Sequence, residues 1–288
     1  MSVVTISKQS YSRSKEVAEA VARQLGYECL SGEVLSEASD EFDVPEIELL
    51  RAVRDSPSLL ERLTFGKEQR TAYFQAALLN HLQRDNVVYH GLAGHYFVGE
   101  VPHVLKVRIL GTTEDRLELV TQRHKVFDQA ATSLSGIPGR GPAGPAKGPL
   151  SRDDALHILH RSDEARQKWG LHLYGSDPSD PRLHDLVIHL KSFSVDEAAG
   201  LIVRAVALPR FQTTPASQKA MEVLCLAAQV QAALVEEIPS AKVEVEGGEI
   251  VVSIRDTWAQ DKKMIAKVEQ VGDRLGGVKL KIRLVSPA

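Results

Sequence analysis

Five residues near the start of the chain have side chains suited to holding phosphate. The segment 8–15, KQSYSRSK, contains Lys8, Ser12, Arg13, Ser14 and Lys15. Cationic side chains neutralise phosphate oxygens, and hydroxyl groups donate hydrogen bonds to them. The free amide groups at the start of a helix also favour an anion. Between a strand and a helix, this segment could therefore bind phosphate; the alternative is a solvated basic loop.

The surrounding pattern provides such a strand and such a helix. Residues 2–7, SVVTIS, form a β-branched run typical of a buried strand. Apolar residues recur at helical spacing from Val17 to Leu25, and Gly26 is placed to end that helix. Further strands are predicted at 86–89, 104–110 and 185–190, and helices at 46–83, 113–125, 151–168 and 195–207. The alternation predicts an α/β fold with a mainly parallel sheet and helices on both faces.

Five segments together carry a family pattern. They are TISKQSYSRSKEVAEAVARQLGYECL (5–30), NVVYHGLAG (86–94), VRILGTTEDRLELVTQR (107–123), SRDDALHILHRSDEAR (151–166) and HDLVIHL (184–190). In this order they resemble the phosphate loop, the V-V-I-x-G-R-G segment, the two lid helices and a late strand of cytidylate-kinase-like P-loop nucleoside monophosphate kinases. The resemblance covers about residues 2–207 and implies a P-loop kinase-like parallel sheet.

The resemblance also implies an activity, which is phosphoryl transfer from ATP to a nucleoside monophosphate such as CMP or dCMP. ATP and Mg²⁺ are the implied cofactors. The implied donor-binding residues are Lys8, Ser12, Arg13, Ser14 and Lys15. The implied catalytic residues are Arg116, Arg123, Asp163 and Arg166, in a lid region spanning about 113–170. The alternative, which does not use the resemblance, is that these arginines lie on helix surfaces and pair with Glu114, Glu118 or Asp163. Asp163 and Arg166 are also spaced for an ion pair within one helix.

Several positions depart from the family pattern. The three glycines of the family's phosphate loop, which let backbone amides close around phosphate, are replaced by Tyr11, Arg13 and Ser14. Ser31-Gly32 stands where the family has an acceptor-side Asp-Arg pair, and Leu92 replaces the arginine of its G-R-G motif. The alternative function is therefore a catalytically degraded pseudokinase that senses a nucleotide or serves as a scaffold. A third interpretation is a structural adaptor without a ligand.

The pattern changes after residue 208. Residues 209–216 are predicted as a linker, and residues 217–288 as a small α/β module of order αββαβ with a hairpin at Gly247-Gly248. The module resembles BON-type modules, which implies a protein partner or a phospholipid surface. Its candidate contact face is the stripe of Lys279, Lys281 and Arg283 on the last strand. The alternative for this stripe is a solvated strand face.

Composition excludes several classes of protein. The chain has 288 residues with 35 Lys and Arg against 38 Asp and Glu, a net charge of -3, so nucleic acid is not an expected partner. Its two cysteines cannot form a disulfide framework and are predicted as free thiols, as in a reducing cytoplasm. No apolar run is long enough to span a membrane.

His157 and His160 lack further ligands, so no metal site is predicted. Residues 136–149, GIPGRGPAGPAKGP, are expected to form a mobile loop within the lid region.

Overall fold

The chain is described here from a computed structural model, which covers residues 1–54, 66–133, 150–255 and 261–285. Its larger part is built on a five-stranded sheet of order β2-β3-β1-β4-β5 in which all neighbours are parallel. The strands are β1 (Val3–Lys8), β2 (Glu28–Leu30), β3 (Val87–Gly91), β4 (Val104–Leu110) and β5 (Leu186–His189). The predicted α/β fold of the P-loop kinase-like type is confirmed. Because β1 is central, the loop that follows it is flanked by the ends of β3 and β4.

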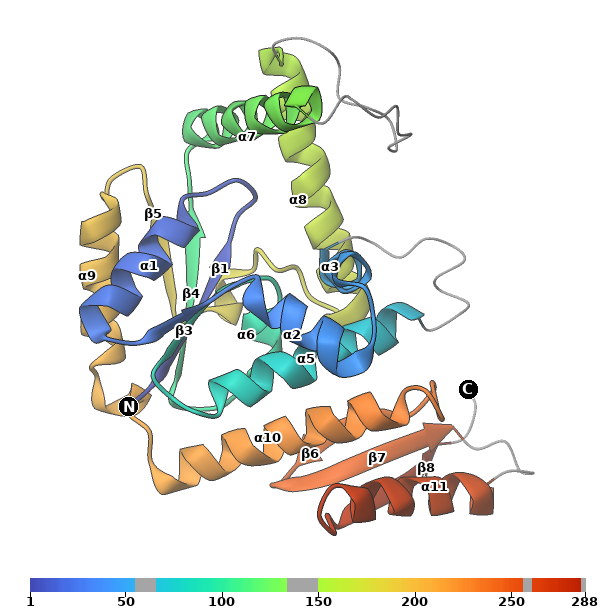
Figure 1. Ribbon diagram of the computed structural model, residues 1–288. Helices are drawn as coiled ribbons and strands as arrows, with labels where there is room; N and C mark the ends of the chain where they lie inside the picture. Colours follow the sequence, from blue (N-terminus) through green and yellow to red (C-terminus); the bar gives the residue numbers. More distant parts are fainter. Residues whose placement is uncertain (55–65, 134–149, 256–260, 286–288) are drawn as a thin grey trace.

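Helices cover both faces of this sheet (Figure 1). On one face, α1 (Ser14–Leu25) and α9 (Val195–Val206) enclose a core with alternate residues of β1, such as Val4 and Ile6. On the other face, α5 (Gly66–Leu82) and α6 (Gly94–Phe97) pack on Val3 and Tyr89. This part also contains α2 (Glu33–Phe42), α3 (Glu46–Arg54) and the short 3-10 turns η1 (Pro181–Leu183) and η2 (Pro209–Phe211).

The helix that follows β1 ends as predicted and begins without a cap. Gly26 adopts φ 68°, and its amide donates to the Ala22 carbonyl, which terminates α1. At the other end Arg13 occupies the N-cap position, and its side chain makes no capping hydrogen bond. The first amides of α1 are therefore not satisfied by an N-cap side chain, the arrangement that leaves a helix start available to an anion.

Two features of this part differ from the predictions. The stretch predicted as one helical region, 46–83, contains two helices, α3 and α5, and residues 55–65 between them lie outside the described residues. The structure also contains β2 and α2, which the sequence patterns did not predict. A three-residue edge strand has too few alternating positions to give a periodic signal.

Two long helices occupy the region predicted as the lid, at the end of the sheet where the strands finish (Figure 1). They are α7 (Thr113–Ser133) and α8 (Arg152–Tyr174), and they pack through a small cluster of their own. Leu117, Val120, Ala155 and Leu159 are its buried members, and Tyr11 of the β1–α1 loop packs against it. The Gly- and Pro-rich segment predicted at 136–149 lies outside the described residues.

The C-terminal part has the predicted αββαβ order. Its elements are α10 (Pro215–Leu234), β6 (Lys242–Glu246), β7 (Glu249–Arg255), α11 (Asp261–Arg274) and β8 (Leu280–Val285). β6 and β7 are antiparallel and joined by Gly247 and Gly248, both at positive φ, whereas β7 and β8 are parallel. Lys281 and Arg283 lie 3.6 and 2.6 Å from the carboxylates of Glu249 and Glu246, so both are engaged in exposed ion pairs on this sheet.

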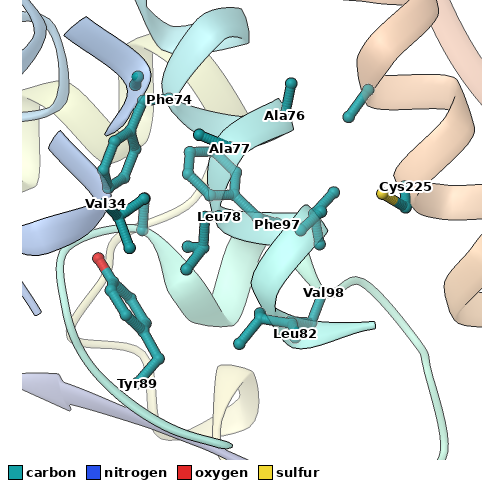
Figure 2. Close-up of a cluster of buried hydrophobic side chains, with 14 of the residues drawn as sticks. Val34, Phe74, Ala76, Ala77, Leu78, Leu82, Tyr89, Phe97, Val98 and Cys225 are labelled. Carbon is teal, nitrogen blue, oxygen red and sulfur yellow. The ribbon is translucent and has the colours of Figure 1, made fainter. Parts of the chain in front are cut away.

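Helix α10 belongs to both hydrophobic cores. Met221, Cys225 and Ala228 are buried with α5 in the larger core, whereas Val230 and Leu234 are buried with β7 and α11. Figure 2 shows Cys225 directed toward the cluster formed by α5 and α6. Packing is therefore continuous across the predicted boundary near residues 209–216. No helix in the described parts of the chain is both long and apolar enough to cross a bilayer.

Candidate functional site

The loop between β1 and α1 keeps one backbone feature of a glycine-rich loop. Tyr11 has φ 56°, in the left-handed region that favours glycine. Arg13 has φ -79° and does not require glycine. The loop is tied to β4, because the Gln9 amide donates to the Ile109 carbonyl at 3.2 Å and the Gly111 amide donates to Gln9 Oε1 at 3.3 Å. Of the glycine replacements, Tyr11 is the one that strains the backbone.

Two serines at the start of α1 carry buried hydroxyl groups that lack a partner. Ser12 Oγ and Ser14 Oγ are inaccessible to solvent and make no hydrogen bond to any described residue. Ser14 is the first residue of α1. A buried hydroxyl without a partner costs free energy, which a ligand oxygen can offset. Ser12 also lines two cavities beside the helix start, whereas Ser14 lines neither.

The predicted cations of the loop have carboxylate partners on α1. Arg13 binds Glu16, with 2.9 Å between Nε and Oε2, and this hydrogen bond raises the pKa of Arg13. Lys15 Nζ lies 3.6 Å from Glu19 in an exposed pair. Lys8 lines two cavities at the end of the sheet.

The lid residues converge on the same loop. Arg116 is buried and donates from Nε to the Ser10 carbonyl at 2.7 Å, while its Nη2 lies 2.6 Å from Asp163 Oδ2. Arg166 donates from Nη1 to the Lys8 carbonyl at 2.7 Å. Asp163 is thus paired with Arg116 on the neighbouring helix, which is one of the pairings that the alternative of surface ion pairs allowed. The structure brings three of the four implied catalytic residues to the loop; Arg123 lies further along α7, and its side chain is outside the described part of the chain.

Two cavities of similar size meet beside Lys8. The first, of about 270 Å³, lies between the ends of β1 and β4 and helix α8, and it includes Ser7, His95 and Arg108. The second, of about 260 Å³, lies toward α2 and α3. Its lining includes Ser12, Ser31, Gly32, Leu50 and Phe74. Both are lined by Lys8, Gly91, Leu92 and Arg166. The positions Ser31-Gly32 and Leu92, which depart from the family, therefore line this site.

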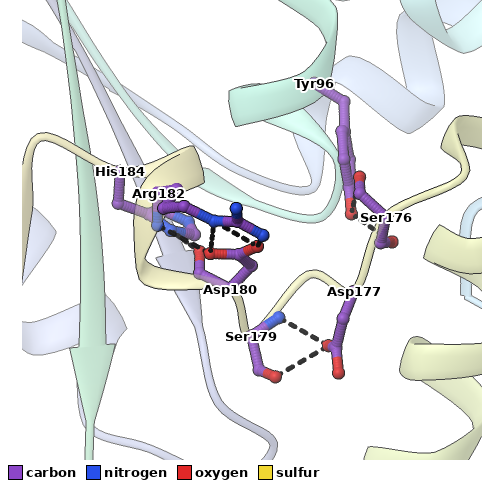
Figure 3. Close-up of polar contacts among 7 residues, drawn as sticks. All are labelled: Tyr96, Ser176, Asp177, Ser179, Asp180, Arg182 and His184. Carbon is purple, nitrogen blue, oxygen red and sulfur yellow. Dashed lines mark hydrogen bonds and ion pairs between the residues drawn. The ribbon is translucent and has the colours of Figure 1, made fainter.

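The first cavity contains polar residues that the sequence patterns did not predict. Ser7 Oγ lies 2.7 Å from His184 Nε2, and His184 Nδ1 lies 3.3 Å from the Asp180 carbonyl (Figure 3). Burial, together with Arg108, lowers the pKa of His184 to about 4. The imidazole is therefore neutral at pH 7, and its Nδ1 proton is placed to donate to the Asp180 carbonyl. Ser7 pairs with Arg108 across β1 and β4, but the sequence carries no signal that these two strands are neighbours.

The residues present fit the phosphates of ATP better than they fit a protein-held metal. Ser12, Ser14 and the uncapped start of α1 supply hydrogen-bond donors to phosphate oxygens. Asp115 lines a small cavity with Ser12 and Arg13, and its carboxylate accepts from Thr112 Oγ1 at 2.6 Å. Within the described ranges, no three His, Cys, Asp or Glu side chains are grouped so as to hold a metal ion. Mg²⁺ would thus be held mainly through the phosphates.

Comparisons with known proteins find one family and several solved structures that are similar to parts of the chain. The cytidylate kinase-like family profile matches residues 3–136, from β1 into α7 and beyond. No curated protein matches the chain. Similar solved structures include an uncharacterized protein from Eubacterium ventriosum ATCC 27560, with a TM-score of 0.47 and 16% identity over 72% of this chain and 98% of that one.

Two further similar structures are shikimate kinases. The enzyme from Bacteroides thetaiotaomicron gives a TM-score of 0.41 and 10% identity over 72% of this chain and 99% of that one. The enzyme from Acinetobacter baumannii, in complex with shikimate, gives a TM-score of 0.39 and 12% identity over 72% of this chain and 93% of that one. By its family match and its sheet order, the chain has a kinase-like nucleotide-binding fold, and residues 3–136 are similar to the cytidylate kinase-like family.

Proposed function

We propose that the chain binds ATP at the β1–α1 loop and transfers its terminal phosphoryl group to a nucleoside monophosphate such as CMP or dCMP. The observation that carries this proposal is the pair of buried hydroxyls, Ser12 and Ser14, without a partner among the described residues at the start of α1. A phosphate group in the cavities that Ser12 lines would meet its hydroxyl beside the first amides of the helix, and Ser14 lies next to that position.

Each implied residue then has a role that follows from its position. Lys8 and Arg166 line both cavities, so they can contact a phosphoryl group that passes between donor and acceptor. Arg116 is engaged with Ser10 and Asp163, so it is a positioning residue that fixes the loop against the lid. Mg²⁺, when bound with ATP, neutralises the phosphate charge, and most of the remaining catalysis is positioning. A catalytic role for Arg123 in the lid remains a prediction.

A sensor or scaffold function is the second candidate, and a specific contact favours it. Arg116 and Arg166 already donate to loop carbonyls, and Tyr11 packs against the apolar cluster of the lid helices. A loop held in this way can bind a nucleotide without the glycine-rich cradle that transfer requires. In this case the C-terminal part would bind a protein partner, and the exposed pairs of Lys281 and Arg283 mark the face to test.

A thermal-shift titration with Mg-ATP, CMP and dCMP tests both functions. A ligand at about 100 times its Kd adds about 2.7 kcal/mol to the stability of the folded state. Shifts with ATP and with one monophosphate, followed by ADP formation, would support transfer. A shift with ATP alone and no turnover would support the sensor. Absence of any shift at millimolar ligand would contradict nucleotide binding.

A double variant and a control variant test where the phosphates of ATP bind. Ser12→Ala with Ser14→Ala removes the two buried hydroxyls, and we expect Mg-ATP affinity to fall about tenfold. Ser36→Ala removes an exposed hydroxyl on α2 and should leave the affinity unchanged. Equal affinities in the two variants would show that the phosphates bind elsewhere.

A further inference from the structure

Most of the lining of the first cavity consists of residues to which the family resemblance gives no role. They include His95, Arg108, Trp169 and Asp177, whereas the acceptor-side positions Ser31-Gly32 line the second cavity. The volume of about 270 Å³ corresponds to about nine water molecules at about 30 Å³ each. A cavity of this size can hold a small molecule other than the nucleotide.

Arg108 brings a positive charge to this cavity that no described carboxylate pairs with. The side chain is half-buried, and its Nη1 donates to the Pro178 carbonyl at 2.7 Å. Within the described ranges, Nε and Nη2 make no hydrogen bond. Burial lowers the pKa of Arg108, but a guanidinium stays charged at pH 7. The Nε and Nη2 edge matches the two oxygens of a carboxylate.

Asp177 brings a negative charge to the same cavity. Its half-buried carboxylate accepts from the amide and the hydroxyl of Ser179, each at 2.7 Å (Figure 3). It also accepts from Gln167 Nε2 at 2.7 Å. Burial acts to raise the pKa of Asp177, but these hydrogen bonds outweigh it and lower the pKa below its usual value. The carboxylate is therefore ionised at pH 7, and its three hydrogen bonds come from uncharged groups.

The charges of Arg108 and Asp177 attract each other without meeting. Arg108 contributes to the lowered pKa of Asp177, yet no salt bridge joins the two side chains. The other carboxylates of the lining are paired, Asp163 with Arg116 at 2.6 Å and Glu164 with Lys168 at 3.4 Å. A cation and an anion held apart in one small cavity suit a ligand that carries both charges, because each half-buried charge then gains a partner.

The lining also supplies a hydrogen-bonding ring and an apolar surface. His95 is 8% exposed, and neither of its ring nitrogens makes a hydrogen bond to a described residue. Burial lowers its pKa well below the usual range, so the neutral ring can donate one hydrogen bond and accept another. Trp169 donates from Nε1 to the Ala52 carbonyl at 2.8 Å, so its ring offers the cavity apolar surface. The lining also includes the apolar residues Leu92, Ala93 and Pro178.

We infer that the first cavity binds a free amino acid with an apolar side chain, such as leucine. The carboxylate of the amino acid pairs with Arg108, its ammonium group pairs with Asp177, and His95 lies beside them as a hydrogen-bond partner. This site does not rest on the proposed function, because it uses neither of the buried hydroxyls at the start of α1. Since Lys8 and Arg166 line both cavities, the amino acid and the nucleotide should change each other's affinity by a limited factor.

The fluorescence of Trp169 in a Trp258→Phe background tests the inference, because this ring lines the cavity. The probes are l-leucine, d-leucine, leucinamide, which lacks the carboxylate, and isocaproate, which lacks the ammonium group. Sodium chloride keeps the ionic strength constant. We expect a saturable change with l-leucine and at least about tenfold weaker binding of the other three, because each lacks or misplaces one charged group. No saturable change with l-leucine, or equal binding of isocaproate, would overturn the inference.

Two charge variants and a control variant assign the contacts. Arg108→Gln should weaken l-leucine at least about tenfold and leave leucinamide unchanged, whereas Asp177→Asn should weaken l-leucine and leave isocaproate unchanged. Unchanged binding of the truncated probe also shows that the variant is folded. Arg108→Lys keeps the charge and should recover part of the loss, and Arg204→Gln, at an exposed position on α9, should have no effect. If either charge variant binds l-leucine as its parent does, the inference is wrong.

Competition separates this site from the nucleotide site. As Mg-ATP or CMP is added, the Kd of l-leucine should change and then level off, because the ligands occupy different cavities. A Kd that rises without limit would place leucine in the nucleotide site and overturn the inference. If the chain binds l-leucine but no nucleotide, the proposed function is wrong while this site stands. If it binds Mg-ATP but not l-leucine, the proposed function stands and this inference is wrong.

Discussion

Arg116 on α7 and Asp163 on α8 form an ion pair, with 2.6 Å between Nη2 and Oδ2, directly beside the β1–α1 loop. The same guanidinium donates from Nε to the carbonyl of Ser10. One arginine therefore joins both lid helices to the loop that is expected to hold phosphate. The positions of the lid and of the loop are coupled through this contact, so a ligand that moves one will move the other.

Arg116→Ala should be strongly destabilising for this reason. Its removal leaves the Ser10 carbonyl and the Asp163 carboxylate without their donor, and we expect a loss of about 2–3 kcal/mol in the free energy of unfolding. Arg152→Ala breaks an exposed pair with Glu114 in the same two helices and should cost less than about 0.5 kcal/mol. Urea unfolding measures both, and equal losses would contradict a buried structural role for Arg116.

At position 11, a glycine variant should be more stable than an alanine variant, which is the reverse of the usual order. Tyr11→Gly and Tyr11→Ala lose nearly the same side chain, but only glycine adopts φ 56° without strain. We expect the glycine variant to be about 1 kcal/mol more stable than the alanine variant in urea unfolding. At Arg13, where φ is -79°, glycine should give no such advantage. The same order at both positions would argue against strain in the loop.

Sequence patterns predicted most of the elements because strands and helices repeat over several residues. The run from Val3 to Ile6 and the helical spacing up to Gly26 located β1 and α1, and with them the loop between. The family pattern placed Arg116 and Arg166 in the lid, and the structure brings both to the loop. Their hydrogen-bond acceptors, two backbone carbonyls, could not be read from residue types.

The polar cluster of the first cavity could not be predicted from the sequence. Ser7, His95, Arg108 and His184 come from four separate segments of the chain. A single residue gives no periodic signal, so only the sheet order reveals that they meet. Helix α10 is similar, because the sequence showed an amphipathic helix but not that it packs on two cores.

His90, which is buried, and His184, which is half-buried, should make the fold sensitive to mild acid. Burial lowers the pKa values of His90 and His184 to about 4, against about 6.5 in an unfolded chain. Below pH 6.5 the unfolded state therefore binds more protons, so stability falls as the pH decreases toward 4. From pH 7 to pH 5, each group should cost about 1–2 kcal/mol in urea unfolding. His184→Phe should remove the contribution of one histidine to this pH dependence. Replacing the exposed His157 with Gln should leave the pH dependence unchanged. An unchanged dependence in His184→Phe would contradict a neutral His184 in the folded state.

Met221 should stabilise the larger core although it lies beyond the predicted linker. The side chain is fully buried on α10 among residues of the larger core. Met221→Ala should cost about 2–4 kcal/mol, the usual range for a buried methionine. Unfolding is followed by the fluorescence of Trp169 in a Trp258→Phe background, and exposed Lys219→Ala serves as the control. A Trp169 transition that Met221→Ala leaves unchanged would show that α10 contributes nothing to the larger core.

The ion pair of Arg13 and Glu16 should control how well the loop binds a nucleotide. Both side chains are about half exposed, and Glu16 holds the guanidinium that the family resemblance assigns to the donor phosphates. Glu16→Gln weakens this hold and removes a negative charge from the start of α1, so we expect Mg-ATP to bind about threefold to tenfold more tightly. Arg13→Glu places a second carboxylate there and should abolish the thermal shift with Mg-ATP. Glu222→Gln, which removes the acid of a similarly spaced exposed pair with Lys219, should have no effect. If Arg13→Glu binds Mg-ATP as the wild type does, the loop does not contact the phosphates, and the buried hydroxyls of Ser12 and Ser14 must have another role.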